Sequence, residues 1–436
     1  MKRLIYPLAI GVIMVGLGSC INENSLSESK QQANSNNYTI PINDAIKQLN
    51  VFLQSNSQKT RGASITYSEV EVVCSKAITR SDSESTPTVD SLLYLINFDN
   101  NMGYAVLAAD RRLETSILAV TEMGSISSDD FNRSSYNDTR VEDGGFDSGL
   151  GDYGDGNNGD GTGLPNDLIV DFVKGKMGDG YNYGGIITPP STPPTYFVKP
   201  LLTTIWGQLW PYNVKCPIED EVHTHTGCVA TAIGQVVAHF GEEKSDKNYK
   251  WAQILEVGKM EDSGGLQYSN APYSNNIVSY TDEQVNEVAS LLKEIGDICD
   301  MNYGSNGSTT MPWKIDNCLK DFGFENSDFY WGYDVDDITN SLLRDYPVII
   351  SAASGTNGHT WVIDGYDIQQ DPDNENNTIL LHCNWGWDGI SNGFYYSGIF
   401  DLNAGAEIYD QNYGDIAGIA DSNYSWMFST VLPDVR

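Results

Sequence analysis

The sequence predicts an α+β protein in which helices and antiparallel strands are largely segregated along the chain. Between 226 and 322, apolar residues recur at three- and four-residue steps, which is typical of amphipathic helices. Between 347 and 400, short runs rich in β-branched and aromatic residues predict strands. Upstream, two apolar runs at 91–98 and 103–109 flank an Asp-Asn-Asn-Met turn, which predicts a hairpin in a separate small domain.

Length and charge limit the classes of function. A chain of 436 residues with 40% hydrophobic residues can form two or three domains with substantial cores. The formal net charge of −34 would repel polyphosphate, so nucleic acid is excluded as a partner.

The N-terminus has the pattern of a targeting segment. A basic start, Met1-Lys2-Arg3, precedes an apolar run at 4–17, and Leu17-Gly18-Ser19-Cys20 resembles a bacterial lipobox. Residues 1–20 are therefore predicted to be a lipoprotein signal peptide, with Cys20 the lipidated residue. The protein would be exported to the cell envelope and touch membrane only through this anchor. An ordinary signal peptide is the alternative.

Three segments between residues 21 and 195 differ in composition. Residues 21–36 are rich in Ser, Asn and Gln and predict a flexible tether. Residues 37–125 combine a helical stripe at 42–53 with the hairpin and a third strand at 117–120. Residues 126–195 predict an acidic Gly/Asp-rich and then Pro-rich linker. A calcium loop at 155–159 is disfavoured, because Gly replaces an oxygen ligand and no Glu closes the loop.

The last 241 positions, 196–436, predict one further domain. Helices are expected first and strands second, in these segments: helices at 226–240, 251–255, 282–292 and 312–322, then strands at 347–352, 359–368, 378–384 and 393–400.

The helix at 226–240 carries the first candidate catalytic residue. Cys228 lies at its start, after Thr226, a candidate N-cap, and Gly227. The positive end of the helix dipole favours a thiolate there and should lower the pKa of the thiol. Gln208 lies twenty residues upstream, so its side-chain amide and the Cys228 backbone N–H could together form an oxyanion hole.

Four sequence blocks then occur in a characteristic order. They are Trp206-Gly207-Gln208-Leu209-Trp210-Pro211-Tyr212-Asn213, Gly227-Cys228-Val229-Ala230-Thr231-Ala232, Gly358-His359-Thr360-Trp361-Val362-Ile363-Asp364-Gly365 and Asn384-Trp385-Gly386-Trp387. Together they resemble the streptopain family of papain-like cysteine peptidases. The resemblance implies a two-lobed papain-like catalytic domain at 196–436, with a helical lobe and an antiparallel sheet lobe. It also implies that 37–125 is an α+β pro-domain that inhibits the enzyme as an intramolecular partner, with activation cleavage between about 126 and 199.

Elimination among the five histidines selects the general base. His239 is eleven residues along the helix from Cys228, about 16 Å away at ~1.5 Å per residue. His382 is flanked by apolar residues and predicts a packed strand position. His359 follows a turn-forming Thr-Asn-Gly stretch and is the best candidate. A zinc site from His223, His225 and Cys228 is the alternative, and it lacks a fourth ligand nearby.

Asn384 is the predicted third member of the catalytic group. Its side-chain carbonyl can accept a hydrogen bond from the His359 imidazole, with Trp385 covering that bond from water. Asp364 competes for this role, but strand alternation turns it to the side opposite His359. By resemblance, Ser308, Gly358 and Trp385 are substrate-binding residues, and the enzyme prefers a bulky apolar residue just before the cleaved one.

The predicted reaction is thioester-mediated hydrolysis of protein or peptide substrates, with Cys228, His359, Asn384 and Gln208 as catalytic residues and no cofactor or metal. An acyltransferase using the same thioester and a non-catalytic binding lipoprotein are the alternatives. Of the seven cysteines, Cys20 is assigned to the anchor and Cys228 to catalysis, and the odd number left cannot all pair. No essential disulfide is expected.

Overall fold

The computed structural model describes residues 39–128, 197–259, 280–400 and 428–435, with gaps inside the first three ranges of which 74–90 is the longest, together with Ile169. The predicted signal peptide with Cys20, the tether at 21–36 and almost all of the linker at 126–195 lie outside the described residues. Within the part of the chain that is described, no helix combines the length and apolar character needed to cross a membrane.

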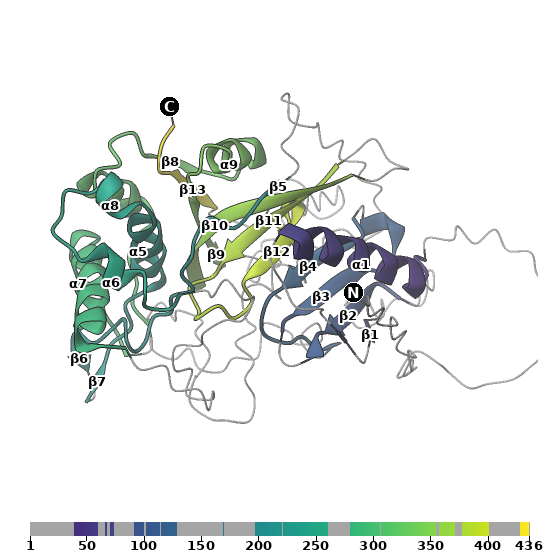
Figure 1. The fold of residues 1–436 in the computed structure, drawn as a ribbon, viewed down its shortest axis with the longest axis horizontal. Coiled ribbons are helices and arrows are strands. Elements are labelled where there is room, and N and C mark those ends of the chain that lie inside the picture. The colour runs from purple at the N-terminus through teal and green to yellow at the C-terminus, as the bar shows by residue number, and fades with distance from the viewer. Residues whose placement is uncertain are drawn as a thin grey trace, which may run out of the picture.

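One large antiparallel sheet connects the two halves of the chain (Figure 1). In spatial order its strands are β1 (Glu71–Val73), β2 (Leu93–Asn97), β3 (Tyr104–Ala108), β4 (Ile117–Thr121), β12 (Gly393–Tyr396), β11 (Asn377–Asn384), β10 (Asn357–Gln370), β9 (Val348–Ser354), β13 (Ser429–Leu432) and β8 (Asp328–Trp331), with β5 (Phe197–Val198) paired to β10. At the junction β4 pairs with β12 through Thr121↔Gly393, Val120↔Phe394 and Ala119↔Tyr395. The predicted small N-terminal domain is therefore an extension of the C-terminal sheet.

The N-terminal unit is built from β1–β4 and the helix α1 (Ile42–Lys59), which packs on β3. The predicted helical stripe faces the sheet, with Leu49 and Phe52 buried. The expected strands are present as β2, β3 and β4. Gly103 ends the β2–β3 turn at φ 93°, and a Cβ there would lie 2.2 Å from the Thr121 carbonyl oxygen, so only glycine fits.

Helices of the C-terminal region gather on the teal side of the molecule in Figure 1. They are α5 (Cys228–Phe240), α6 (Trp251–Ile254), α7 (Asp282–Ile298) and α8 (Lys314–Asp321). The helix α9 (Val335–Leu342) lies apart from them and packs against β9 and β10. A capping box of Thr281 and Gln284 starts α7, which explains the sharp beginning of that helix. The sequence predicted α5 to α8 but missed α9, the hairpin of β6 (Ile218–Glu219) and β7 (Val222–His223), and the strands β8 and β13.

Two hydrophobic cores lie against opposite faces of β10. Val362 packs in the core formed by α5, α6, α7 and α8, whereas Trp361 and Ile363 belong to the core that continues into the N-terminal unit. This division follows from the strand geometry, because successive side chains point to opposite faces. The predicted α+β class, with a helical part packed against an antiparallel sheet, is confirmed. The two faces of β10 also determine how the site is arranged.

Candidate active site

Cys228 is the first residue of α5, as predicted, but its cap differs from the expectation. The N-cap is Gly227, at φ 87°, and no side chain caps the helix. A Cβ at Gly227 would lie 2.9 Å from the Met301 sulfur and 3.0 Å from the Ser308 carbonyl oxygen, so the position requires glycine. Thr226, the expected cap, instead directs its hydroxyl to the Gln208 carbonyl and to Thr231.

Gln208 is held beside the start of α5 by the backbone. The Thr226 N–H donates to the Gln208 carbonyl at 3.1 Å, two residues before Cys228. The Gln208 side chain is 6% exposed, and its Nε2 is buried without a hydrogen-bond partner. An unpaired buried N–H is costly, and this donor is free to bind a ligand oxygen.

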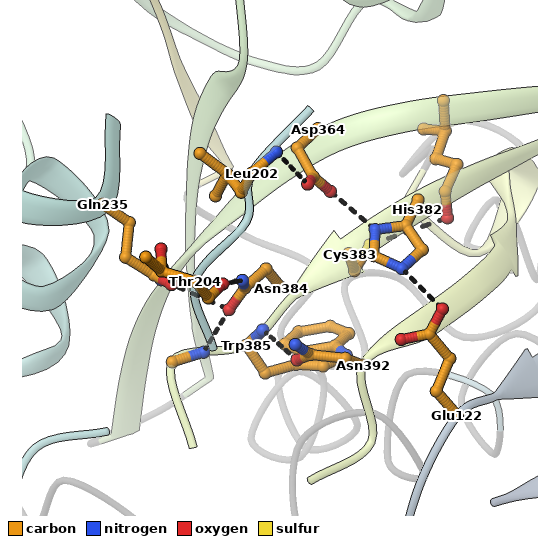
Figure 2. Close-up of polar contacts among 12 residues, drawn as sticks. Glu122, Leu202, Thr204, Gln235, Asp364, His382, Cys383, Asn384, Trp385 and Asn392 are labelled. Carbon is orange, nitrogen blue, oxygen red and sulfur yellow. Dashed lines mark hydrogen bonds and ion pairs between the residues drawn. The ribbon is translucent and has the colours of Figure 1, made fainter. Parts of the chain in front are cut away.

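Asn384, at the end of β11, lies on the α5 side of the sheet. Its partner across the strands is Val362, and its amide contacts the Gln235 side chain of α5 (Figure 2). Oδ1 accepts from Gln235 Nε2 at 3.2 Å and from the Gly386 N–H at 3.3 Å, and Nδ2 donates to the Thr204 carbonyl at 2.8 Å. The predicted hydrogen bond from His359 to Asn384 is therefore not formed here.

His359, near the start of β10, is packed among tryptophans. Its ring centroid lies 4.7 Å from that of Trp387 and stacks with Trp361 and Trp385. Its Nε2 donates to the Trp385 carbonyl at 2.8 Å. Thr360, the next residue, lies close enough to the Cys228 thiol to lower its pKa. By alternation His359 and Thr360 project from opposite faces, so the imidazole is turned away from the sulfur and no Cys228–His359 hydrogen bond is made.

The titration behaviour of the two residues matches this arrangement. Burial raises the pKa of the Cys228 thiol, and the neighbouring Thr360 only partly offsets that rise. Burial lowers the pKa of His359 to about 4, despite the hydrogen bond to the Trp385 carbonyl. Both groups are consequently neutral near pH 7, so the predicted lowering of the thiol pKa does not hold in this form.

The three predicted substrate-binding residues occupy different environments. Ser308 is 3% exposed, and its hydroxyl donates to the His225 carbonyl at 2.7 Å, so the residue braces the loop before Cys228. Gly358 is partly exposed in β10, one residue before His359. Trp385 is completely buried. Of the three, Gly358 alone presents surface to a substrate in this form.

Comparison with known proteins shows a similarity to one family. Residues 206–395 match the model of the Peptidase C10 family. This region is therefore similar to the peptidases of that family. The Thiol protease/hemagglutinin PrtT of Porphyromonas gingivalis is 29% identical over 215 residues, covering 46% of this chain and 24% of that protein. Streptopain of Streptococcus pyogenes is 28% identical over 215 residues, covering 42% of this chain and 51% of that protein.

The chain thus spans about half or less of the length of these two relatives. A solved fragment of prointerpain A from Prevotella intermedia covers 80% of this chain and 97% of its own, with a TM-score of 0.51 and 21% identity. That likeness concerns the fold, and it extends over both the N-terminal unit and the C10 region. The resemblance noted in the sequence is therefore correct for the family and for the fold.

Some residues of the site were not anticipated. Gln235 joins α5 to Asn384, Thr360 lies close to the thiol, and Trp387 packs closest on the His359 ring. The signal for Gln235 was its amide on an otherwise apolar helix, because a buried amide must be hydrogen-bonded. Among the described residues, no group of His, Cys, Asp or Glu has an arrangement that could hold a metal ion.

His382 and Asp364 form a buried charged cluster with a residue of the N-terminal unit. His382 Nδ1 lies 2.6 Å from Asp364 Oδ1, and its Nε2 lies 3.5 Å from Oε1 of Glu122, which directly follows β4 (Figure 2). Both His382 and Asp364 are 1% exposed. Asp364 also accepts from the Leu202 N–H, so it supports His382 rather than His359. His382, expected to be an ordinary packed strand residue, is instead the centre of this cluster.

The cluster makes stability depend on pH. Burial alone would lower the pKa of His382, but Asp364 and then Glu122 outweigh it and raise that pKa to about 10. Burial alone would raise the pKa of Glu122, and its interaction with the His382 imidazole 3.5 Å away instead lowers that pKa. The stabilisation of the fold by His382 is complete below the ordinary pKa of histidine near 6.5, and it is lost as the pH rises through about 10. The stabilisation of the fold by Glu122 is present above about pH 4.5, and it is lost as the pH falls further.

Replacing His382 with Gln should therefore destabilise the chain most at mildly acidic pH. The free energy of unfolding is measured by urea titration with tryptophan fluorescence, in a Cys228→Ala background that prevents self-cleavage. It is expected to fall by roughly 3 kcal/mol at pH 6. The difference from the parent should shrink toward pH 10, where the native imidazole also loses its charge. His223→Gln is the matched control, because that ring contacts the Cys216 carbonyl rather than a carboxylate. An equal loss at pH 6 and pH 10 would contradict the assigned charge.

Proposed function

We propose that this chain is the precursor of a cysteine endopeptidase that hydrolyses peptide bonds in proteins. The main support is the pairing of Cys228, at the N-terminus of α5, with the unpaired Gln208 amide held next to it. A nucleophile beside a preorganised and otherwise unused donor is the arrangement that acyl transfer requires. The similarity of 206–395 to the Peptidase C10 family supports this assignment. The residues proposed to carry catalysis are Cys228, Gln208, His359 and Asn384.

In the proposed reaction, the imidazole of His359 removes the thiol proton and the Cys228 sulfur attacks the substrate carbonyl. The resulting oxyanion receives hydrogen bonds from Gln208 Nε2 and from the Cys228 backbone N–H. The C–N bond breaks as the imidazolium protonates the leaving amine, which leaves a thioester. Water, deprotonated by the same imidazole, then attacks the thioester, and the thiol regains its proton as the acid product departs.

The described form is proposed to be latent. Catalysis requires His359 on the α5 face of β10, whereas here it is neutral and held by the Trp385 carbonyl. A hydrogen-bond path leads from that carbonyl to the N-terminal unit. The Trp385 N–H donates to Asn392 Oδ1 at 2.9 Å, and the Asn392 carbonyl accepts from the Glu122 N–H at 2.8 Å. Together with the β4–β12 pairing, these contacts stabilise the Asn384–Trp387 segment and the turned imidazole.

The N-terminal unit, 37–125, is accordingly proposed to be an inhibitory pro-domain, with 126–195 as the linker in which activation cleavage occurs. Cleavage there would allow β4 to leave β12 and the Trp385 segment to rearrange. Export with a lipid anchor on Cys20 is part of the same proposal, since an enzyme restrained by a pro-domain can cross the membrane inactive. Gly358, Ser308 and Trp385 are proposed to line the substrate cleft once His359 has turned.

An epoxide that alkylates thiols tests the proposal directly. After incubation that permits self-processing, the protein is expected to hydrolyse a fluorescent denatured protein and to lose this activity in proportion to one covalent adduct. Mass spectrometry of the labelled peptide should map the adduct to Cys228. The unprocessed chain should be labelled much more slowly, because its thiol is neutral.

A fluorophosphonate directed at serine serves as the matched control and should leave hydrolysis unchanged. Full hydrolysis by protein that is completely alkylated at Cys228, or an inactivating adduct on a different cysteine, would refute the assignment. Equal labelling rates before and after processing would refute the proposed latency alone.

A further inference from the structure

We infer that Gln235 is a positioning residue that fixes the amide orientation of Asn384 and links it to the Gln208 segment and to the helix of Cys228. The inference rests on the proposed function and concerns a residue that takes no part in the reaction itself. Gln235 lies seven residues after Cys228 on α5 and is 1% exposed. Its amide therefore depends entirely on protein partners, and all of those described belong to catalytic segments.

The oxygen of Gln235 gathers donors from two of these segments. Oε1 accepts from the Trp206 N–H at 3.1 Å, from the Thr204 hydroxyl at 3.1 Å and from Asn384 Nδ2 at 3.2 Å. Trp206 is two residues before Gln208 in the same segment. A single side chain thus ties the proposed oxyanion donor and the proposed third catalytic residue to the helix that carries the nucleophile.

Backbone groups determine which way both amides face. The Trp206 N–H can only donate, so the Gln235 atom that it meets must be the oxygen. The Thr204 carbonyl can only accept, so the Asn384 atom 2.8 Å from it must be the nitrogen. The two amides then face each other in a reciprocal pair, with Gln235 Nε2 donating to Asn384 Oδ1 (Figure 2). Neither can rotate by 180° without opposing two like groups.

This orientation is the one that catalysis needs. An asparagine that supports an imidazolium must present its oxygen, because the imidazolium can only donate. Nδ2 of Asn384 is held by the Thr204 carbonyl at 2.8 Å and by Gln235, whereas the two contacts to Oδ1, at 3.2 and 3.3 Å, are both longer than the bond to Thr204. An incoming imidazole N–H can replace one of them while the nitrogen end stays fixed. Gln235 would thus hold the Asn384 amide in the required orientation before the His359 imidazole binds to it.

The test compares Gln235→Met with the processed wild-type enzyme. Met has a similar volume but cannot donate or accept as the amide does. We expect kcat to fall about 10-fold to 100-fold, with KM within about twofold, because Asn384 loses its fixed orientation. The bell-shaped pH profile of kcat/KM should also narrow from both sides, since a poorly supported imidazolium disfavours the ion pair with the thiolate. The pH dependence of Cys228 alkylation should show the same shift on its acid side.

Gln253→Met, the same chemical change on α6, is the matched control and should leave both the kcat and the profile unchanged. If Gln235→Met does not fold, Gln235→Glu retains the shape and the acceptor contacts but removes the donor to Asn384, and it should still lower kcat at least tenfold. A lower kcat in Gln235→Met with an unchanged pH profile would show that Gln235 only packs the core, and it would overturn the inference. Wild-type kinetics in Gln235→Met would overturn it as well. Hydrolysis that persists in Cys228→Ala would instead overturn the proposed function.

Discussion

Replacing Cys228 with alanine is expected to abolish hydrolysis of denatured protein and to stop self-processing while the fold stays intact. Without the sulfur no thioester can form, and loss of a nucleophile that acts together with its base costs on the order of 10⁶-fold in kcat. The fold should survive, because Ala is a good helix former at the start of α5 and is close to Cys in size. Release of fluorescent peptides and the size of the purified chain on a denaturing gel are the measurements.

Cys216→Ala provides the control for this change. Cys216 is also a free thiol, but burial raises its pKa to about 11, so it is a poor nucleophile at neutral pH. Its variant should retain both hydrolysis and self-processing. Processing of the Cys228→Ala chain by added wild-type enzyme would show that the precursor is still cleavable. Hydrolysis that continues in purified Cys228→Ala would assign the chemistry to another residue.

Local patterns in the sequence were sufficient for most individual elements. The stripe that predicts α5 and the hairpin that predicts β2 and β3 depend on residues close together in the chain, so periodicity finds them. Short strands such as β8 and β13 were missed, since a strand of four residues gives little periodic signal. The pairing of β4 with β12 was also missed, because partners more than 270 residues apart leave no local pattern.

The candidate site shows the same limit more sharply. Motif order predicts that Cys228 and Gln208 lie close together, and the Gln208 backbone accepts a hydrogen bond from a residue two positions before the cysteine. It could not reveal that His359 faces away from α5, because the motif sets the order of the residues and not the face on which each side chain lies. The face that a side chain takes depends on the neighbouring strands and on the N-terminal unit, through contacts such as the one to Trp385.

The proposed latency has a consistent energetic basis. A neutral imidazole stacked among Trp361, Trp385 and Trp387 avoids the cost of burying an ion, while the thiol stays protonated. Forming the catalytic ion pair requires both residues to meet on the α5 face. A buried ion pair lies instead at His382 and Asp364, where Glu122 of the N-terminal unit completes the cluster. Contacts of the N-terminal unit thus stabilise the sheet around this pair.

Substitution of Gln208 by leucine is the second change with a large expected effect. The Nε2 donor is without a partner in the described form, so it is available for an oxyanion that appears only in the transition state. Removing such a donor should lower kcat by about 10²-fold to 10³-fold while KM changes little. Steady-state kinetics of the processed enzyme on a fluorogenic peptide measure both quantities. A raised KM with unchanged kcat would mean that Gln208 binds the ground state instead.

The same variant should be at least as stable as the parent, which separates a catalytic role from a structural one. A buried N–H that lacks a partner costs about 1–3 kcal/mol, and an apolar side chain of similar size removes that cost. Urea unfolding of Gln208→Leu in the Cys228→Ala background should therefore give an unchanged or higher free energy of unfolding. Replacing a residue that supports the fold lowers the stability of the protein. Replacing a donor that acts only in the transition state lowers kcat and leaves the stability unchanged. A less stable Gln208→Leu chain would show that the amide has a structural partner and would remove the main support for the oxyanion hole.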